Sequence, residues 1–367
     1  MTNRKTIGFT INSLNAGGAE RVITSLANEL VTNYNVIIIT VIKCDSFYEL
    51  NSKVKLLSCD LTVPEKQNKI SAINNNIYII KKITNLIKLE SIDLLIGFTT
   101  SVNVLTILSA KLNNIPSIIS ERNNPVANPP NKFWKTLRNF TYKYANYLIV
   151  QTSSNKAFYS QILPSKKIVV IRNPIASVLA SKRIIREKNA RNKTILTVGR
   201  LDSNKAQDVL IRAFSNISKS NDWQLQLIGD GNKMEEYKTI ATDHNIIDRV
   251  SFLGNVTNVH DYYNNAGIFA FTSKSEGYPN ALAEALYFGM PSISTNCPHG
   301  PSDLIENEIN GLLIEVDNQK MLEIQLKRLM TNENLRYNLS KSAITKSNKL
   351  DISLITASWM KYFNKLL

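Results

Sequence analysis

The sequence predicts an α/β protein built from two doubly wound domains that face each other across a central cleft. A chain of 367 residues is too long for one ordinary hydrophobic core and fits two domains. Short β-branched runs alternate with longer helical periods, which is typical of βαβ units and a parallel sheet. The alternation lapses once, in the middle of the chain, and then begins again, which predicts two copies of one architecture.

The first half of the chain is a regular series of strands and helices. A helix is predicted over Ala19–Leu30, whose apolar side chains share one face, and another over Asn74–Leu89. The predicted strands are Thr6–Ile11, Val36–Ile42, Asp93–Phe98, Ser117–Ser120, Tyr147–Gln151 and Ile168–Ile171. We expect residues 1–173 to form the first domain.

Residues 174–192 are predicted to be a linker, because this polar and basic stretch has no strand signal. A second series follows, with a helix over Ala206–Ser218. Its predicted strands are Thr194–Val198, Gln224–Ile228, Val250–Leu253, Ile268–Phe271 and Ser292–Ser294. We expect residues 193–345 to form the second domain and 346–367 a helix that packs back on the first. Ligands bind such sheets at the carboxyl ends of the strands.

The net charge of +15 predicts an anionic partner: nucleic acid, an acidic membrane surface or a phosphorylated small molecule. The alternative is a basic surface exposed only to solvent. Three widely spaced cysteines without a CxxC pair argue against a disulfide framework or a zinc site. No apolar run is long enough to span a bilayer and no secretory signal is visible, so we expect a cytosolic protein that touches a membrane only from the side.

Glycine-containing loops follow the first strand of each half. Gly17 and Gly18 lie between a strand and a helix, where free amides suit an anion, although a tight turn without a ligand explains them equally well. In the second half, Gly199 and Arg200 follow a strand and Lys205 precedes a helix. Two cations at a strand end suit a diphosphate, and the alternative is a pair of surface cations.

The strongest local signal is the segment Ser275–Leu286. Pro279 fits the first position of a helix, which places Glu276 on the loop before it and Glu284 inside it. Apolar residues surround Glu284, and a buried carboxylate without a partner is expensive. Its partner is a protein cation or a hydroxyl-rich ligand, and we favour the ligand because Arg200 and Lys205 are expected to point to the same place.

A basic and aromatic stretch occupies residues 131–147. Its cations, Lys132, Lys135, Arg138 and Lys143, are interleaved with aromatic side chains. Such a helix suits an anionic membrane surface or a lipid diphosphate. The alternative is an ordinary amphipathic helix whose basic face meets solvent.

Taken together, these motifs resemble the retaining glycosyltransferases of family 4, whose GT-B fold has two facing Rossmann-like domains. The resemblance covers essentially the whole chain. It rests on the early GGAE loop, GRL followed by Lys205, the GDG turn, FLG ending at Gly254, and Glu276 and Glu284 eight positions apart. The stretches Ser120–Asn123 and Cys297–Asp303 resemble the bacterial branch that builds lipid-linked glycans, especially N-acetylhexosamine transferases acting on undecaprenyl-diphosphate oligosaccharides.

The resemblance implies a role for each matching residue. Arg200 and Lys205 would neutralise the leaving diphosphate, Glu276 would hold the transferred sugar and Glu284 the ribose. Donor phosphates would meet the amides of the early loop. The remaining substrate-binding positions are Gly17, Gly18, Gly199, Gly229, Gly254, Gly277, Tyr278, Pro279 and Asn280.

Arg122 and His299 lie in the two stretches that resemble the branch building lipid-linked glycans. Arg122 stands where many relatives place a histidine, which suggests a cation near a phosphate, and His299 is an acceptor-side candidate. No acidic pair of the DxD type appears, so we expect no metal and no cofactor beyond the donor substrate.

The implied function is transfer of a sugar, best N-acetylgalactosamine, from a UDP-sugar to a polyisoprenyl-diphosphate-linked glycan at the cytoplasmic face of the inner membrane. A galactosyl- or glucosyltransferase is the alternative within the family. An isomerase or phosphorylase would share the fold. A membrane scaffold or a nucleic-acid-binding protein would explain the charge, yet no nucleic-acid recognition motif appears. The oligomeric state is not predicted.

Overall fold

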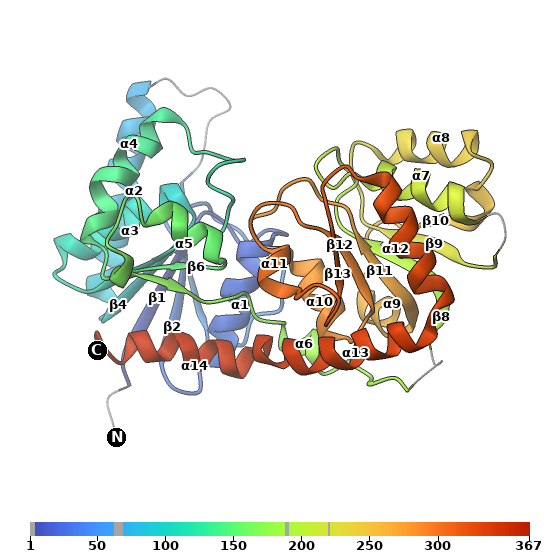
Figure 1. Cartoon of the computed structure of the whole chain (residues 1–367). Coiled ribbons are helices and arrows are strands. Elements are labelled where there is room, and N and C mark those ends of the chain that lie inside the picture. The colour runs from blue at the N-terminus through green and yellow to red at the C-terminus, as the bar shows by residue number, and fades with distance from the viewer. Residues whose placement is uncertain (1–3, 62–68, 188–190, 219–220) are drawn as a thin grey trace. The chain divides into compact units, whose positions relative to one another are not determined.

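A computed structural model describes residues 4–61, 69–187, 191–218 and 221–367. The chain forms two compact units, Met1–Ala176 with Ile352–Leu367, and Ser177–Asp351 (Figure 1). Each unit contains one parallel sheet with helices on its faces. The prediction of two Rossmann-like α/β domains is therefore confirmed.

Over the described residues, the first unit holds a seven-stranded sheet in the order β3-β2-β1-β4-β5-β6-β7. Every neighbouring pair is parallel. The strands are β1 (Thr6–Ile11), β2 (Asn35–Thr40), β3 (Lys55–Ser58), β4 (Leu94–Phe98), β5 (Ser117–Ser120), β6 (Tyr147–Val150) and β7 (Ile168–Val170). Strand β3 was not predicted, because this four-residue edge strand is only partly buried and has no long apolar run.

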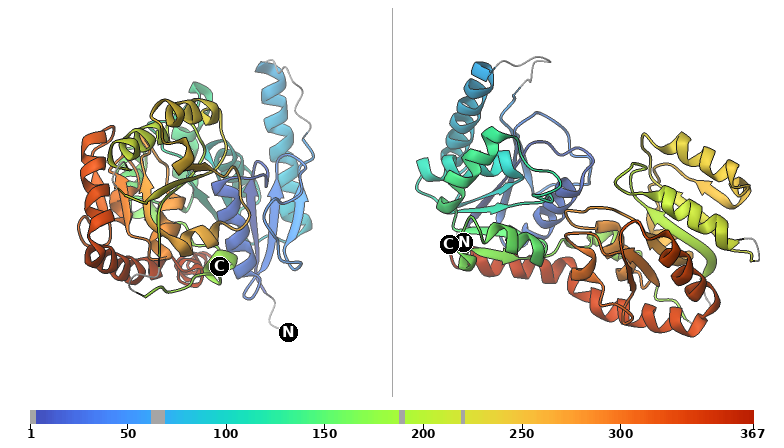
Figure 2. Two further views of the ribbon diagram at one scale, coloured as in Figure 1. Left: turned by 90° about the vertical axis from the view of Figure 1, so that its right-hand side faces the viewer. Right: turned by 45° about the horizontal axis from the view of Figure 1, so that its top comes forward.

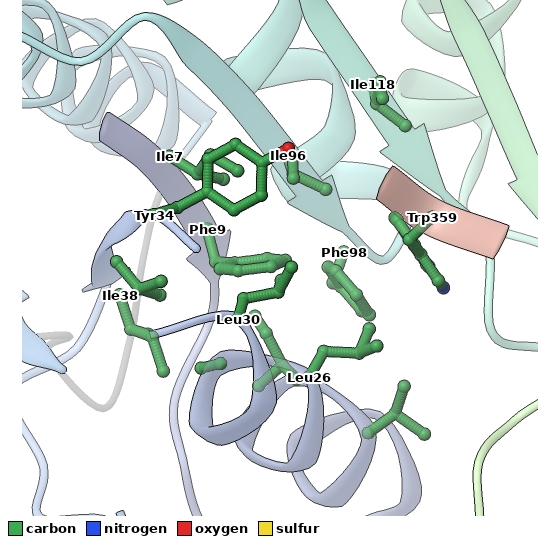
Figure 3. Close-up of a cluster of buried hydrophobic side chains, with 14 of the residues drawn as sticks. Ile7, Phe9, Leu26, Leu30, Tyr34, Ile38, Ile96, Phe98, Ile118 and Trp359 are labelled. Carbon is green, nitrogen blue, oxygen red and sulfur yellow. The ribbon is translucent and has the colours of Figure 1, made fainter. Parts of the chain in front are cut away.

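Helices cover both faces of this first sheet. They are α1 (Gly18–Leu30), α2 (Lys69–Leu89), α3 (Thr100–Leu112), α4 (Lys132–Thr141), α5 (Ser153–Tyr159) and α14 (Ile352–Phe363). On the face covered by α1 and α14, the Phe98 ring stacks on Trp359 with centroids 6.0 Å apart, and Phe9 and Leu26 pack beside it (Figure 3). The opposite face packs against α2 and α3.

Over the described residues, the second unit holds a six-stranded sheet in the order β10-β9-β8-β11-β12-β13, again parallel throughout. The strands are β8 (Asn192–Val198), β9 (Gln224–Ile228), β10 (Val250–Phe252), β11 (Ala266–Phe271), β12 (Ser292–Thr295) and β13 (Leu312–Ile314). The edge strand β13, whose sequence is LLI, was not predicted, since a short leucine-rich run does not distinguish a strand from a helix.

The second unit also contains helices on both sides of its sheet. They are α6 (Ser177–Ala180), α7 (Gln207–Ile217), α8 (Met234–Asp243), α9 (Val259–Asn265), α10 (Asn280–Tyr287), α11 (Pro301–Leu304), α12 (Gln319–Thr331) and α13 (Glu333–Ser347). Helices α7 and α12 lie side by side, as Figure 2 shows. They bury Phe214 and Leu326 in the core of this unit.

Most of the predicted linker is attached to the second unit. The Ile184 amide donates to Asn264 Oδ1 at 2.9 Å, and Arg183 Nη1 donates to the Tyr287 carbonyl at 3.1 Å. Residues 188–190 lie outside the described part of the chain. In the described ranges, no helix combines the length and the hydropathy that crossing a bilayer requires.

Candidate functional site

The predicted site residues of the second unit gather at one edge of its sheet. Gly199 follows β8, Gly229 follows β9, and the loop before α10 follows β11. These strands are neighbours in the order β9-β8-β11-β12 and all run the same way, so their carboxyl ends share one edge. The Gly229 amide donates to the Gly254 carbonyl at 2.8 Å, which brings the loop after β10 to the same edge.

Gly229 is required by close packing between two of these loops. Its φ of 128° is unfavourable for residues with a side chain. A Cβ atom at this position would lie 2.0 Å from the Gly199 carbonyl oxygen. The turn after β9 therefore seats against the start of the loop that carries Arg200 and Lys205.

Lys205 and Glu276 form an ion pair with each other. Lys205 Nζ lies 2.5 Å from Glu276 Oε1, and the side chains are 20% and 9% exposed. The two residues were predicted to contact different parts of a ligand, and the structure shows that they also contact each other. An ammonium group has three donors, so Lys205 can keep this contact and still donate to an oxyanion.

The other predicted cation, Arg200, is largely in solvent. Its side chain is 79% exposed, and its Nη2 lies 3.1 Å from Asp202 Oδ2. The backbone around it is well fixed, because Gln207 Nε2 donates to the Arg200 carbonyl at 2.8 Å. Asp202 Oδ1 accepts the Lys205 amide at 2.9 Å. The loop is thus rigid while the Arg200 side chain stays available to an anion.

Glu284 lies in the middle of α10 and is only 5% exposed. The Tyr263 hydroxyl, from α9, donates to its Oε2 at 3.0 Å. From the sequence, a ligand was favoured over a protein partner for Glu284. The contact with Tyr263 was not predicted, because this residue lies 21 positions earlier on another helix. A hydroxyl satisfies one lone pair of the carboxylate without neutralising its charge, so Glu284 can accept further hydrogen bonds from a polyol.

The start of α10 differs by one residue from the prediction. Pro279 is the N-cap residue rather than the first helical residue, and α10 begins at Asn280. Tyr278 is buried, and Asn204 Nδ2 donates to the Ser275 carbonyl at 2.8 Å, which ties this loop to the one after β8.

The loop after β12 closes against the Glu276 segment. Thr295 Oγ1 donates to the Ser273 carbonyl at 2.6 Å. Burial and then the Glu276 carboxylate raise the pKa of the Cys297 thiol to about 12, so this thiol lies within electrostatic reach of Glu276. The stretch Cys297–Asp303 packs against the segment that follows Glu276, because a Cβ atom on Gly300 would lie 2.3 Å from Cδ of Pro279.

In the first unit, the early glycine loop is filled by the chain's own carboxylate. Gly17 is the N-cap residue of α1 and Gly18 its first residue. A Cβ atom on Gly17 would lie 2.1 Å from Glu20 Oε2, so the Glu20 carboxylate covers Gly17 at the start of the helix. Acidic side chains stabilise helix N-termini. This arrangement favours the turn interpretation over an anion site at Gly17 and Gly18.

Arg122 lies beside the stacked rings of Phe98 and Trp359 in the first unit. Its guanidinium carbon lies 4.6 Å from the Phe98 ring centroid and 5.7 Å from that of Trp359. Nη1 donates to Asn173 Oδ1 at 2.6 Å, while Nε and Nη2 are buried without a partner among the described residues. Burial lowers the pKa of Arg122 to about 9, which leaves it charged at neutral pH.

Arg138 does not belong to the exposed basic face to which the sequence assigned it. Its side chain is buried, with the guanidinium 5.6 Å from the rings of both Phe158 and Tyr159. The predicted contact of Arg138 with a membrane or lipid diphosphate is therefore wrong, because the planar guanidinium is used to pack the core of the first unit.

The other three predicted cations are exposed. Lys132 and Lys135 lie on α4, and Lys143 lies in the short 3-10 turn η1 (Tyr142–Tyr144). Exposed aromatic side chains accompany them. We call Lys132, Lys135, Lys143, Phe133 and Phe140 the basic–aromatic surface.

A groove of about 730 Å³ opens beside this surface within the first unit. Nine of its fifteen lining residues are apolar, among them Ile79 of α2 and Leu105 of α3. Lys132, Phe133 and Trp134 complete it at the start of α4. The groove thus combines an apolar interior with a cation.

A buried carboxyl group, Glu121, lies beside Arg122 but points to the opposite face of the sheet. It accepts hydrogen bonds from the Tyr142 hydroxyl and from Thr100 Oγ1. Burial raises its pKa above the ordinary value, although the hydrogen bonds from Tyr142 and Thr100 and the charge of Arg138 oppose the shift. From the sequence, Glu121 had no predicted role beyond belonging to the stretch Ser120–Asn123.

Among the residues that the structure describes, no cluster of three or more His, Cys, Asp or Glu side chains is placed to hold a metal ion. The expectation that the reaction needs no metal stays a prediction.

Comparison with known proteins finds glycosyltransferase families over both halves of the chain. A family model described as Glycosyltransferase Family 4 matches residues 16–177, and one described as Glycosyl transferases group 1 matches residues 180–346. The chain is 30% identical over 358 residues to a Campylobacter jejuni enzyme, covering 97% of each chain. That enzyme is named GalNAc-alpha-(1->4)-GalNAc-alpha-(1->3)-diNAcBac-PP-undecaprenol alpha-1,4-N-acetyl-D-galactosaminyltransferase.

Two solved structures share the fold over nearly the whole chain. A glycosyltransferase from Rickettsia africae superposes with a TM-score of 0.81 at 18% identity, covering 99% of both chains. Anabaena HepE in complex with UDP superposes with a TM-score of 0.79 at 15% identity, covering 99% of this chain and 100% of that one. The sequence match over both units and the shared GT-B fold identify the chain as a member of the family 4 glycosyltransferases.

Proposed function

We propose that the protein transfers a sugar from a UDP-sugar to a polyisoprenyl-diphosphate-linked glycan, with retention of configuration. The observation that carries this proposal is the joint placement of the Lys205–Glu276 pair and the buried Glu284 at the carboxyl edge of one parallel sheet. This edge is where doubly wound folds bind nucleotides.

On the donor side, Glu284 accepts hydrogen bonds from the ribose hydroxyls, and Tyr263 holds the carboxylate in place. Lys205 donates to the diphosphate while keeping its contact with Glu276, and exposed Arg200 swings onto the same anion. As the bond between the sugar and UDP breaks, negative charge grows on the departing phosphate. Preorganised cations stabilise such charge, which lowers the barrier to transfer.

Glu276 holds a hydroxyl of the transferred sugar with the carboxylate oxygen that Lys205 leaves free. Retention follows when the acceptor hydroxyl attacks from the face that UDP leaves. The departing phosphate oxygen then accepts the proton of that hydroxyl. These roles need no metal ion, because protein cations offset the charge of the leaving group.

On the acceptor side, the basic–aromatic surface meets the anionic cytoplasmic leaflet of the inner membrane. Each lysine near such a surface contributes about 1 kcal/mol of attraction. The groove beside it accepts part of the isoprenoid chain, since its apolar lining suits a hydrocarbon and Lys132 suits the diphosphate at the end of that chain. Arg122, with two donors still available, lies in the same unit and suits an oxygen of the acceptor glycan.

N-acetylgalactosamine is the preferred sugar. Its support is the name of the Campylobacter jejuni relative, an N-acetyl-D-galactosaminyltransferase whose name includes a diphosphate-linked undecaprenol glycan. A galactosyl- or glucosyltransferase is the alternative, because the difference lies in a few contacts to one sugar substituent.

The test is a panel of UDP-sugars incubated with the purified protein and a polyprenyl-diphosphate oligosaccharide. We expect free UDP and a lengthened glycan only when both substrates are present, with UDP-N-acetylgalactosamine fastest and with EDTA causing no loss. Analysis of the product by NMR should show an α linkage. UDP release without an acceptor, or an unchanged glycan with every donor, would contradict the proposal.

A further inference from the structure

The loop after β12 holds a histidine in a conformation that disfavours side chains. His299 has a φ of 66°, and the next residue, Gly300, has a φ of 133°. A non-glycine residue in the left-handed region is strained, and such residues cluster at functional sites. Glycine at position 299 would adopt the same backbone without strain, so the imidazole is retained at a cost to stability.

The imidazole of His299 is buried and incompletely satisfied. It is 8% exposed, and its Nδ1 has no hydrogen-bond partner among the described residues. Burial lowers the pKa of His299, and the nearby Asp303 carboxylate only partly opposes this shift. The ring is therefore neutral at neutral pH, with one nitrogen that donates and one that accepts. A buried polar atom without a partner is unfavourable, which points to a partner that binds.

Contacts of its chain neighbours place His299 near the segment that carries Glu276. A Cβ atom on Gly300 would lie 2.3 Å from Cδ of Pro279, so Gly300 seats directly on the segment that follows Glu276. On the other side of His299, the Cys297 thiol responds electrostatically to both Glu276 and Lys205. In the chain, His299 therefore lies between Cys297, whose thiol is influenced by the charges of Glu276 and Lys205, and Gly300, which contacts Pro279.

We propose that His299 recognises the transferred sugar of the donor. Its neutral imidazole forms a hydrogen bond through Nδ1 with a hydroxyl or acetamido group of that sugar. This inference rests on the proposed function and adds a sugar contact to it. It also moves His299 from the acceptor side, where the sequence suggested it, to the donor side. His299 acts in binding and positioning, and takes no proton from the reacting atoms.

The test compares His299→Gly with His299→Asn. Both residues tolerate a positive φ, but only asparagine retains a hydrogen-bonding side chain. We expect His299→Gly to weaken binding of UDP-N-acetylgalactosamine about tenfold and to lower kcat/KM by about the same factor, as loss of one hydrogen bond predicts. His299→Asn should restore at least half of the affinity on a logarithmic scale. Binding of UDP alone, measured by calorimetry, should change less than twofold in both.

Three results would overturn the inference. His299→Gly with wild-type kcat/KM would show that the imidazole contacts no substrate. An equal loss of affinity for UDP and for the UDP-sugar would show a structural role for the loop. No rescue by His299→Asn, in a variant whose Tm equals that of wild type, would also count against it. A wild-type protein that binds neither UDP nor any UDP-sugar would instead refute the proposed function itself.

Discussion

Separating the Lys205–Glu276 pair should destabilise the second unit unequally, depending on which partner is removed. In Lys205→Met, the Glu276 carboxylate is left 9% exposed without its cation. Breaking a buried pair from one side costs about 3–5 kcal/mol. Because the pair borders solvent, we expect the lower end, about 3 kcal/mol. In a unit of this size, that lowers Tm by about 6–12 °C.

In Glu276→Gln, the residue left behind is Lys205, which is 20% exposed and has a long flexible stem. Its ammonium group can extend to water, so we expect a smaller loss of about 1–2 kcal/mol, or about 2–8 °C in Tm. The double variant contains neither charge. Its loss should therefore fall short of the sum of the single losses by at least ~1 kcal/mol.

The assay is urea unfolding of the full chain followed by intrinsic fluorescence and by circular dichroism, supported by calorimetry. Two probes are needed because a chain with two units need not unfold in one step. Strict additivity within ~0.5 kcal/mol would refute the coupling, and a larger loss in Glu276→Gln than in Lys205→Met would refute the argument from exposure.

Three further perturbations follow from the site and its surroundings. Glu284→Ala should raise KM for the UDP-sugar at least tenfold with a smaller change in kcat. Glu276→Ala should mainly lower kcat. Wild-type steady-state kinetics in both variants would contradict the assigned roles. Replacing the three lysines of the basic–aromatic surface by glutamine should reduce sedimentation with phosphatidylserine vesicles at least tenfold and leave Tm unchanged. The control Arg138→Gln should lower Tm by several degrees and leave vesicle binding intact. Unaltered sedimentation of the lysine variant would count against a membrane role. Burial raises the pKa of Glu121 above 4.5, so the folded state retains its proton longer than the unfolded state. The resulting stabilisation is present below pH 4.5 and is lost as pH rises through the raised pKa of Glu121. Glu121→Gln should therefore lose less stability across this pH range, as measured by urea titrations. Identical pH profiles of wild type and variant would refute this expectation.

Much of the fold was predictable because its signals are local. Alternation of β-branched runs with helical periods identified strands such as β1 and β8, and both sheets are parallel as that alternation implied. The edge strands β3 (KLLS) and β13 (LLI) were not predicted, because they are rich in leucine, whereas the predicted edge strands β7 (IVV) and β10 (VSF) contain the β-branched residues that indicate a strand. The loops that hold Arg200, Lys205 and Glu276 were found for the same local reason: glycine and proline mark the ends of strands and the starts of helices.

The sequence by itself determined which residues lie at strand ends, and hence the candidates of the second unit. The tertiary structure alone decided which of them meet. Strand β11 is inserted beside β8, which brings Glu276 to Lys205 although 71 positions separate them. Likewise, the Tyr263 contact with Glu284 and the burial of Arg138 depend on how helices pack. The spacing of residues along a chain fixes the face of a helix, but it does not fix what that face meets.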